Sequence, residues 1–210
     1  MSNSLELLDL QVTRDGQPLI HGLTYRLHSN ELLVVQGQNG AGKTTLLKTL
    51  AGLLPPSGGE IRLNGEQLTH DFHPRPLFIG HKRGLTPSLS VADNVRVWAR
   101  AARNDELYRA ALHFFDLEGL EDVPLQQLSA GWQQRVALTR LITMPAYLWL
   151  LDEPTANLDK AGVERLHALL QTRLEQGGMV VMTSHHSQIE GENVKFINIS
   201  NMDSNIEVIH

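Results

Sequence analysis

A glycine-rich segment near residue 40 carries the clearest chemical signal in the chain. Residues 37–45 read GQNGAGKTT and fit the pattern G-x-x-x-x-G-K-[ST]. In such a loop the glycines let backbone N–H groups face phosphate oxygens, Lys43 places an ammonium on the β- and γ-phosphates, and the Thr44 hydroxyl can bind Mg²⁺. The pattern predicts a nucleoside triphosphatase whose phosphate-binding residues are Gly37, Gln38, Asn39, Gly40, Ala41, Gly42, Lys43, Thr44 and Thr45.

Two acidic residues follow a second apolar run. Residues 148–153 read LWLLDE, which predicts a buried strand that ends in Asp152 and Glu153 at the carboxyl edge of a sheet. Asp152 is placed to hold Mg²⁺ through water, and Glu153 to act as the general base that polarises the attacking water. A third apolar run, MVVMT, leads to His185, which can hydrogen-bond the γ-phosphate and hold that water in line. We prefer His185 to the adjacent His186 because it directly follows Thr-Ser.

The segment LSAGWQQR at residues 128–135 is a weak motif in isolation. Ser129 can cap the helix that follows it, and Ala130 and Gly131 leave room for a phosphate at the helix N-terminus. It gains meaning only from its place between the glycine loop and the acidic pair.

The expected secondary structure places these motifs on an α/β scaffold. Alternating strands and helices predict a P-loop NTPase core with a parallel sheet, and residues 84–143 form an inserted helical subdomain. The first ~30 and last ~20 residues read as β hairpins, so a small antiparallel sheet is also expected. Ser90 or Asp93 caps the first helix of the subdomain, and Gly119 ends the last one. The strands are expected at 31–36, 60–63, 77–80, 147–151 and 179–183, and the helices at 43–51, within 90–120, from about 130, and at 160–175.

The composition excludes several classes of protein. The 210 residues carry a net charge of −5, which lacks the basic excess typical of nucleic-acid binding. There is no cysteine for a disulfide framework or a thiolate metal site. We expect no signal peptide, no direct membrane insertion and no nucleic-acid partner, so any work at a membrane requires docking to other subunits.

Taken together, these motifs resemble those of the nucleotide-binding subunits of ABC transporters over nearly the whole chain. The glycine loop, LSAGWQQR, LWLLDE, the ANLD of residues 156–159 and MTSH occur in the order that this family has. The resemblance implies one ABC-type ATP-binding domain over residues 1–210 that uses ATP and Mg²⁺. It also implies a head-to-tail homodimer, in which Ser129 and Gly131 of one subunit cover ATP in the other, and integral membrane permease subunits as partners.

Three positions depart from the family pattern. His81 stands where the family usually has a glutamine that senses Mg²⁺, and neutral imidazole could still touch Mg²⁺-bound water. Trp132 stands where the signature usually has glutamine. Arg14 lies where an aromatic residue normally stacks on adenine, and a guanidinium can also stack on a ring. These departures bear on rate and nucleotide preference rather than on the type of reaction.

Within that family, the short chain, the Gly80-His81 loop and LWLLDEPTANLD resemble the ATP-binding subunits of the bacterial cytochrome c maturation system, a haem exporter. That resemblance implies peripheral attachment at the cytoplasmic face of the inner membrane. The alternatives are an ABC transporter ATPase for another substrate and a soluble ABC ATPase without a transport role. No residue recognises haem chemically, so the cargo and the direction of transport stay open.

Overall fold

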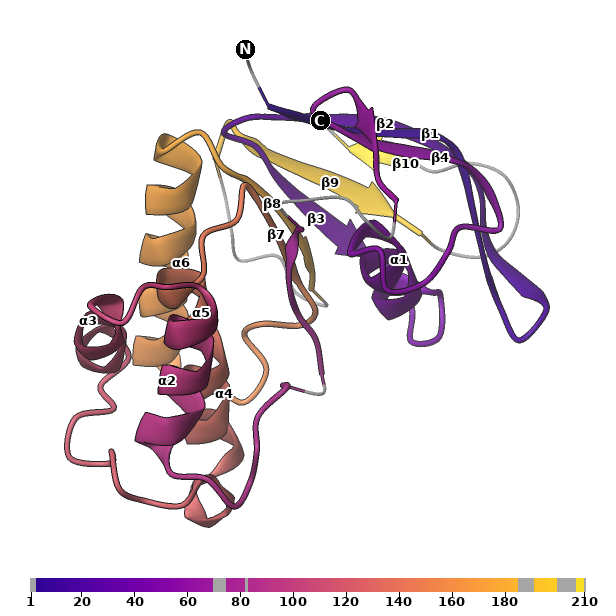
Figure 1. Ribbon diagram of the computed structural model, residues 1–210. Helices are drawn as coiled ribbons and strands as arrows, with labels where there is room; N and C mark the ends of the chain where they lie inside the picture. Colours follow the sequence, from indigo (N-terminus) through magenta and orange to yellow (C-terminus); the bar gives the residue numbers. More distant parts are fainter. Residues whose placement is uncertain (1–2, 70–74, 82, 185–190, 200–206, 210) are drawn as a thin grey trace. The chain divides into compact units, whose positions relative to one another are not determined.

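The computed structural model describes residues 3–69, 75–81, 83–184, 191–199 and 207–209. The chain divides into two compact units, each built from segments that are distant in sequence. Unit 1 comprises residues 1–78, 146–153 and 170–210, and unit 2 comprises residues 79–145 and 154–169. Both sheets belong to unit 1 except for Ile79 at the end of one strand, and most of the helices belong to unit 2 (Figure 1).

The smaller sheet of unit 1 is antiparallel and is built mainly from the N-terminal hairpin. Its strand order is β2-β1-β4-β5. The Asn64-Gly65 pair connects β4 to β5 as the sequence predicted, and both residues adopt positive φ. The strands are β1 (Ser4–Arg14), β2 (Gln17–His28), β4 (Gly58–Leu63) and β5 (Glu66–Gln67).

The larger sheet has the order β10-β9-β3-β8-β7-β6. Strand β3 pairs in parallel with β8 and β9, and β7 pairs in parallel with β8, which confirms the predicted parallel sheet. The uninterrupted apolar runs of β7 and β8 are buried along their whole length, as expected for strands covered on both faces. The strands are β3 (Leu32–Gln36), β6 (Leu77–Ile79), β7 (Leu148–Leu151), β8 (Met179–Thr183), β9 (Val194–Asn198) and β10 (Glu207–Ile209).

The C-terminal strands correct one expectation. We expected the last residues to form a β hairpin in the small antiparallel sheet. Their antiparallel pairing is confirmed, but the sheet that they join was wrong. Strand β9 lies in parallel register beside β3, with Val34 opposite Phe196, and β10 then pairs antiparallel with β9. A hairpin pattern in sequence does not say which sheet it joins, because that choice depends on a partner strand far away in the chain.

Helix α1 (Lys43–Leu50) shares a hydrophobic core with the strands of unit 1. It contacts β1 of the smaller sheet and β7 and β8 of the larger one. Leu46, Leu47 and Leu50 are almost fully buried, and each contributes roughly 1.5–3 kcal/mol relative to exposure. This packing fixes the N-terminus of the helix, where the glycine loop ends.

Unit 2 is largely helical. Ser90 caps the first helix by accepting from the Asp93 N–H at 3.1 Å, which confirms the predicted cap. The predicted end at Gly119 was wrong, because the helix before it already ends at Phe114 and Asp116 takes the left-handed conformation with φ 54°. The helices are α2 (Val91–Ala101), α3 (Leu107–Phe114), the 3-10 helix η1 (Leu125–Gln127), α4 (Ala130–Leu138), α5 (Arg140–Thr143) and α6 (Lys160–Glu175), the last with residues 160–169 in this unit.

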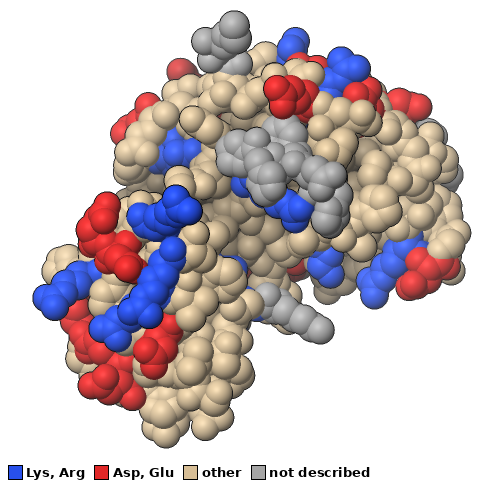
Figure 2. All heavy atoms as spheres, in the orientation of Figure 1, with Lys and Arg blue, Asp and Glu red and all other residues tan. Residues whose placement is uncertain are grey.

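Acidic and basic side chains are interspersed over the helical part seen in Figure 2. Arg96 lies 3.9 Å from Asp93, and Arg100 lies 3.9 Å from Asp105. All four side chains are substantially exposed, so these pairs add little stability. Among the described residues, no helix combines the length and the apolarity that a membrane crossing requires.

Asn94 holds the loop that leads into α2. The side chain is buried, and its Oδ1 accepts from the Thr86 N–H at 2.8 Å. Its Nδ2 lies within hydrogen-bonding distance of three carbonyl oxygens, those of Thr86, Leu89 and Ser90. One buried amide therefore satisfies the Thr86 N–H and adds to the hydrogen bonds that the loop makes with η1 and within itself.

We expect Asn94→Leu to lower the free energy of unfolding by about 2–4 kcal/mol, because it leaves the Thr86 N–H without its partner and removes the amide from a packed site. Urea unfolding measures the change. The exposed Gln126→Ala serves as the control and should change stability by less than about 0.5 kcal/mol. A loss in Asn94→Leu no larger than that of the control would contradict this role.

Candidate functional site

The glycine loop connects β3 to α1 and is held by close backbone packing. Gly37 has φ 149°, and a Cβ there would lie 2.8 Å from the Ile199 carbonyl oxygen. Gly42 occupies the N-cap of α1 with φ 101°, and it offers no side chain to cap the helix. The helix therefore begins at the loop with its dipole and first N–H groups available to an anion.

Lys43 is folded into this loop. Its side chain is buried, and Nζ donates to the Gly37 carbonyl at 2.7 Å and to the Gln38 carbonyl at 3.1 Å. These contacts hold the ammonium inside the curve of the loop. A phosphate bound there would meet a positive charge already in place.

Thr44 joins the loop to the acidic pair. Its Oγ1 donates to Asp152 Oδ2 at 2.8 Å, although 108 residues separate the two in sequence. Asp152 is largely buried and follows β7, which lies between β8 and β6 in the sheet. The structure thus brings together Thr44 and Asp152, the hydroxyl and the carboxylate that the sequence assigned to Mg²⁺.

Thr183 completes this arrangement, and sequence analysis gave it no role. It ends β8 and is fully buried. Its Oγ1 donates to Asp152 Oδ1 at 2.9 Å and accepts from the Glu153 N–H at 2.8 Å. The sequence showed only that Thr183 ends an apolar strand. It did not show that Asp152 and Glu153 lie beside it, because the fold decides which strands are neighbours.

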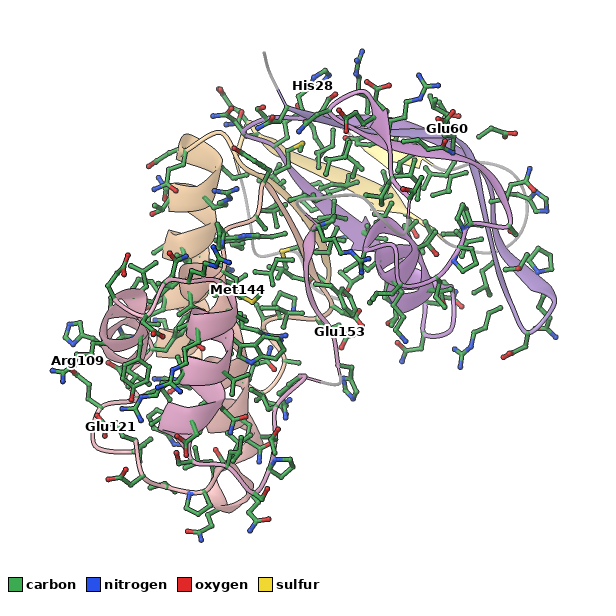
Figure 3. All side chains as sticks on the ribbon, in the orientation of Figure 1. His28, Glu60, Arg109, Glu121, Met144 and Glu153 are labelled. Carbon is green, nitrogen blue, oxygen red and sulfur yellow. The ribbon has the colours of Figure 1, made fainter. Side chains whose placement is uncertain are left out.

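Glu153 has an unusual backbone conformation. It lies just after β7, where Figure 3 labels it, and its φ is 49°. This left-handed conformation is unfavourable for a residue with a Cβ and costs of order 1–3 kcal/mol where the surroundings impose it. The hydrogen bond from its N–H to Thr183 is one contact that maintains it.

The oxygen atoms of Thr44 and Asp152 suit a small, hard divalent cation. Within the described parts of the chain, no group of three or more His, Cys, Asp or Glu side chains could hold a metal ion. A cation at Thr44 and Asp152 would therefore complete its coordination with phosphate oxygens and water. This is how Mg²⁺ usually binds at nucleotide sites.

The structure does not test three of the predicted site residues. His185 lies outside the described residues. His81 is exposed and belongs to unit 2. Arg14 ends β1, is 71% exposed, and has its Nε 3.6 Å from an Asp15 carboxylate oxygen. Their roles remain predictions.

The signature segment begins α4 in unit 2. Ser129 accepts from the Trp132 N–H at 3.4 Å, as predicted for a helix cap. A Cβ on Gly131 would lie 2.6 Å from the Asn157 carbonyl oxygen. Glycine is therefore required here for packing within the chain, whatever ligand approaches the helix N-terminus.

Arg135 ties α4 to the start of α6. Its Nη2 donates to both carboxylate oxygens of Asp159, at 2.7 and 2.9 Å, and its Nη1 donates to Asp116 at 3.2 Å. The hydrogen bonds from Arg135 are the main reason that the pKa of Asp159 is lowered. The guanidinium also lies over the Trp132 ring, 4.7 Å from its centroid, so Trp132 supports this ion pair.

Comparison with known proteins agrees with this geometry. The family model described as ABC transporter matches residues 20–156, and the chain belongs to this family. Two solved structures share the fold. One, titled as an ATP-binding subunit of an ABC transporter, has a TM-score of 0.82 and 24% identity over 92% of this chain and 85% of its own. The other, an ABC transporter ATP-binding protein from Pyrococcus furiosus, has a TM-score of 0.80 and 26% identity over 92% and 96%.

Within this family, the chain is similar to curated proteins named cytochrome c biogenesis ATP-binding export protein CcmA. The protein of Hahella chejuensis is 41% identical, covering 90% of this chain and 92% of its own. The Escherichia coli K12 protein is 41% identical over 86% and 88%. The Wolbachia pipientis wMel protein is 39% identical over 87% and 90%.

We expect Thr183→Val to slow ATP hydrolysis on the order of 10-fold, because it frees the Asp152 carboxylate and the Glu153 backbone from their shared partner. The isosteric change should also lower the free energy of unfolding by about 1–3 kcal/mol. Steady-state phosphate release and urea unfolding measure the two effects. Thr183→Ser keeps the hydroxyl and is the matched control. Wild-type hydrolysis by the valine variant would refute this role for the hydroxyl.

Proposed function

We propose that this chain is the ATP-hydrolysing subunit of an ABC export complex that handles haem during the assembly of c-type cytochromes. The proposal rests on the glycine loop joined to an acidic strand end, and on relatives named as cytochrome c biogenesis ATP-binding export proteins. The observation that carries the ATPase part is the 2.8 Å hydrogen bond from Thr44 to Asp152.

The reaction is the hydrolysis of ATP to ADP and phosphate. Residues 37–45 bind the phosphates through backbone N–H groups, and Lys43 supplies positive charge to the β- and γ-phosphates. Thr44 and Asp152 would hold Mg²⁺, the carboxylate of Asp152 acting through water. Bound Mg²⁺ offsets the charge on the phosphate oxygens.

Glu153 acts as the general base for the attacking water. Its backbone is fixed by Thr183, so the carboxylate starts from a defined position at the end of β7. His185 binds the γ-phosphate, as the family resemblance suggests. His81 and Arg14 stand where the family usually has a glutamine and an aromatic residue; His81 reaches Mg²⁺-bound water, and Arg14 stacks on adenine.

Hydrolysis takes place in a homodimer. Two copies stack head to tail, and Ser129 and Gly131 of one copy close over ATP bound by the other. Ser129 lies at the N-terminus of α4, where the helix dipole favours an anion, although the Trp132 N–H is already bonded to the Ser129 hydroxyl. In this proposal residues 1–210 form one ATP-binding domain, with a helical subdomain at about residues 84–143.

The dimer docks on integral membrane permease subunits at the cytoplasmic face of the inner membrane. ATP-driven closure and reopening after hydrolysis change the shape of those subunits. This chain then supplies the energy, and the membrane subunits supply the path for the cargo.

We expect Glu153→Gln to lower turnover on the order of 100-fold or more, because the amide cannot accept the proton of the attacking water. ATP should still bind and trap the closed dimer, which size-exclusion chromatography with ATP would detect. Glu60→Gln changes the same group on β4 of the antiparallel sheet and should hydrolyse ATP normally. Near-normal turnover by Glu153→Gln would refute the assigned base.

The cargo requires a separate test in cells. In a bacterium that lacks its own cytochrome c biogenesis ATPase, co-expression of this chain with its membrane subunits should restore haem-staining c-type cytochromes. Lys43→Ala should not restore them, although it should still co-purify with the membrane subunits. Normal ATPase activity without any restoration would point to another substrate.

A further inference from the structure

A buried amide in the signature helix connects two segments that are far apart in sequence. Gln134 lies in α4 and is only 6% exposed. Its Nε2 donates to the Pro154 carbonyl at 3.0 Å, and its Oε1 accepts from Arg83 Nε at 2.8 Å. All three residues belong to unit 2.

Both partners of Gln134 lie close in sequence to a residue with a proposed role in ATP hydrolysis. Pro154 directly follows Glu153, the proposed base, and Arg83 lies two residues after His81. The amide therefore binds the backbone just beyond the base and the side chain just beyond the proposed Mg²⁺ sensor. A movement of either segment therefore moves the Gln134 amide, to which the other segment is bonded.

Arg83 is held from both its side chain and its main chain. Its Nη1 donates to Gln133 Oε1 at 3.1 Å, and its carbonyl accepts from Arg140 Nη2 at 2.8 Å. Arg140 is buried beneath the loop, with its guanidinium 5.0 Å from the Trp98 ring centroid. Burial lowers the pKa of Arg140 to about 10 and leaves it charged near neutral pH. Arg83 is thus a fixed partner for Gln134 rather than a freely moving surface arginine.

Gln133 reinforces the same site from the other side. Its Nε2 lies within hydrogen-bonding distance of the Leu125 carbonyl at 3.3 Å and the Leu128 carbonyl at 3.0 Å. The two glutamines therefore join α4 to the chain before the signature, to Arg83 and to Pro154. These contacts form a single hydrogen-bonded network with α4 at its centre.

We propose that Gln134 and Arg83 are positioning residues for ATP hydrolysis, which make the segment after His81 and the segment after Glu153 move together through α4. The inference rests on the proposed role of Glu153. Neither side chain contributes to the phosphate loop of unit 1, so their loss acts on turnover rather than on nucleotide affinity. The coupling requires both halves of the amide, because Oε1 binds Arg83 while Nε2 binds Pro154.

The test compares Gln134→Met, Arg83→Met and the double variant in steady-state ATP hydrolysis. Each single change should lower kcat on the order of 10-fold and leave KM for ATP within about 2-fold of wild type. The double variant should show about the same loss as either single one, because the two residues act through one contact. Arg83→Lys keeps a donor for Gln134 and should recover most of the rate.

Further variants distinguish a positioning role from a loss of folding and from an error in the assignment of Glu153 as the base. Arg109→Met removes an exposed arginine on α3, labelled in Figure 3, and should leave kcat unchanged. If buried Gln134→Met fails to fold, half-buried Arg83→Met and Arg83→Lys still decide the question. Independent, multiplicative losses, a parallel rise in KM, or no loss at all would overturn the inference. If Glu153→Gln instead kept full activity, the proposed function itself would be wrong.

Discussion

The structure depends on one set of hydrogen bonds that joins the phosphate loop to the ends of two central strands. Thr44 at the start of α1, Asp152 after β7 and Thr183 at the end of β8 meet in a largely buried place. Core packing of α1 against β7 and β8 brings these ends together, and the hydrogen bonds then define their geometry. A hydroxyl and a carboxylate supply few of the oxygen ligands that Mg²⁺ requires, so a cation bound here would take the rest from phosphate oxygens and water.

The signature helix has an internal role in addition to the one implied by its family. Gly131 lets the Asn157 carbonyl come close, Arg135 binds Asp159, and Gln134 binds Pro154. The segment after the proposed base is therefore held along its length by α4. Trp132 also supports these contacts, because the Arg135 guanidinium packs over its ring.

Much of the fold follows from local sequence patterns, and the errors occur where distant partners decide. Helix α6 and strand β8 have the bounds that their apolar spacing predicted, and Ser90 and Ser129 cap the helices that follow them. The placement of the C-terminal strands was missed because their own residues do not indicate that β9 pairs with β3. Thr183 was missed for the same reason, since its partners come from β7.

The most direct test of the central claim is the Mg²⁺ dependence of ATP binding in Asp152→Asn, measured by isothermal titration calorimetry. In the proposed role Asp152 holds the cation beside Thr44, so Mg²⁺ should tighten ATP binding on the order of 10-fold or more in the wild type and far less in the variant. ATP binding without Mg²⁺ should be similar in both proteins. An equal effect of Mg²⁺ on the two would contradict the account.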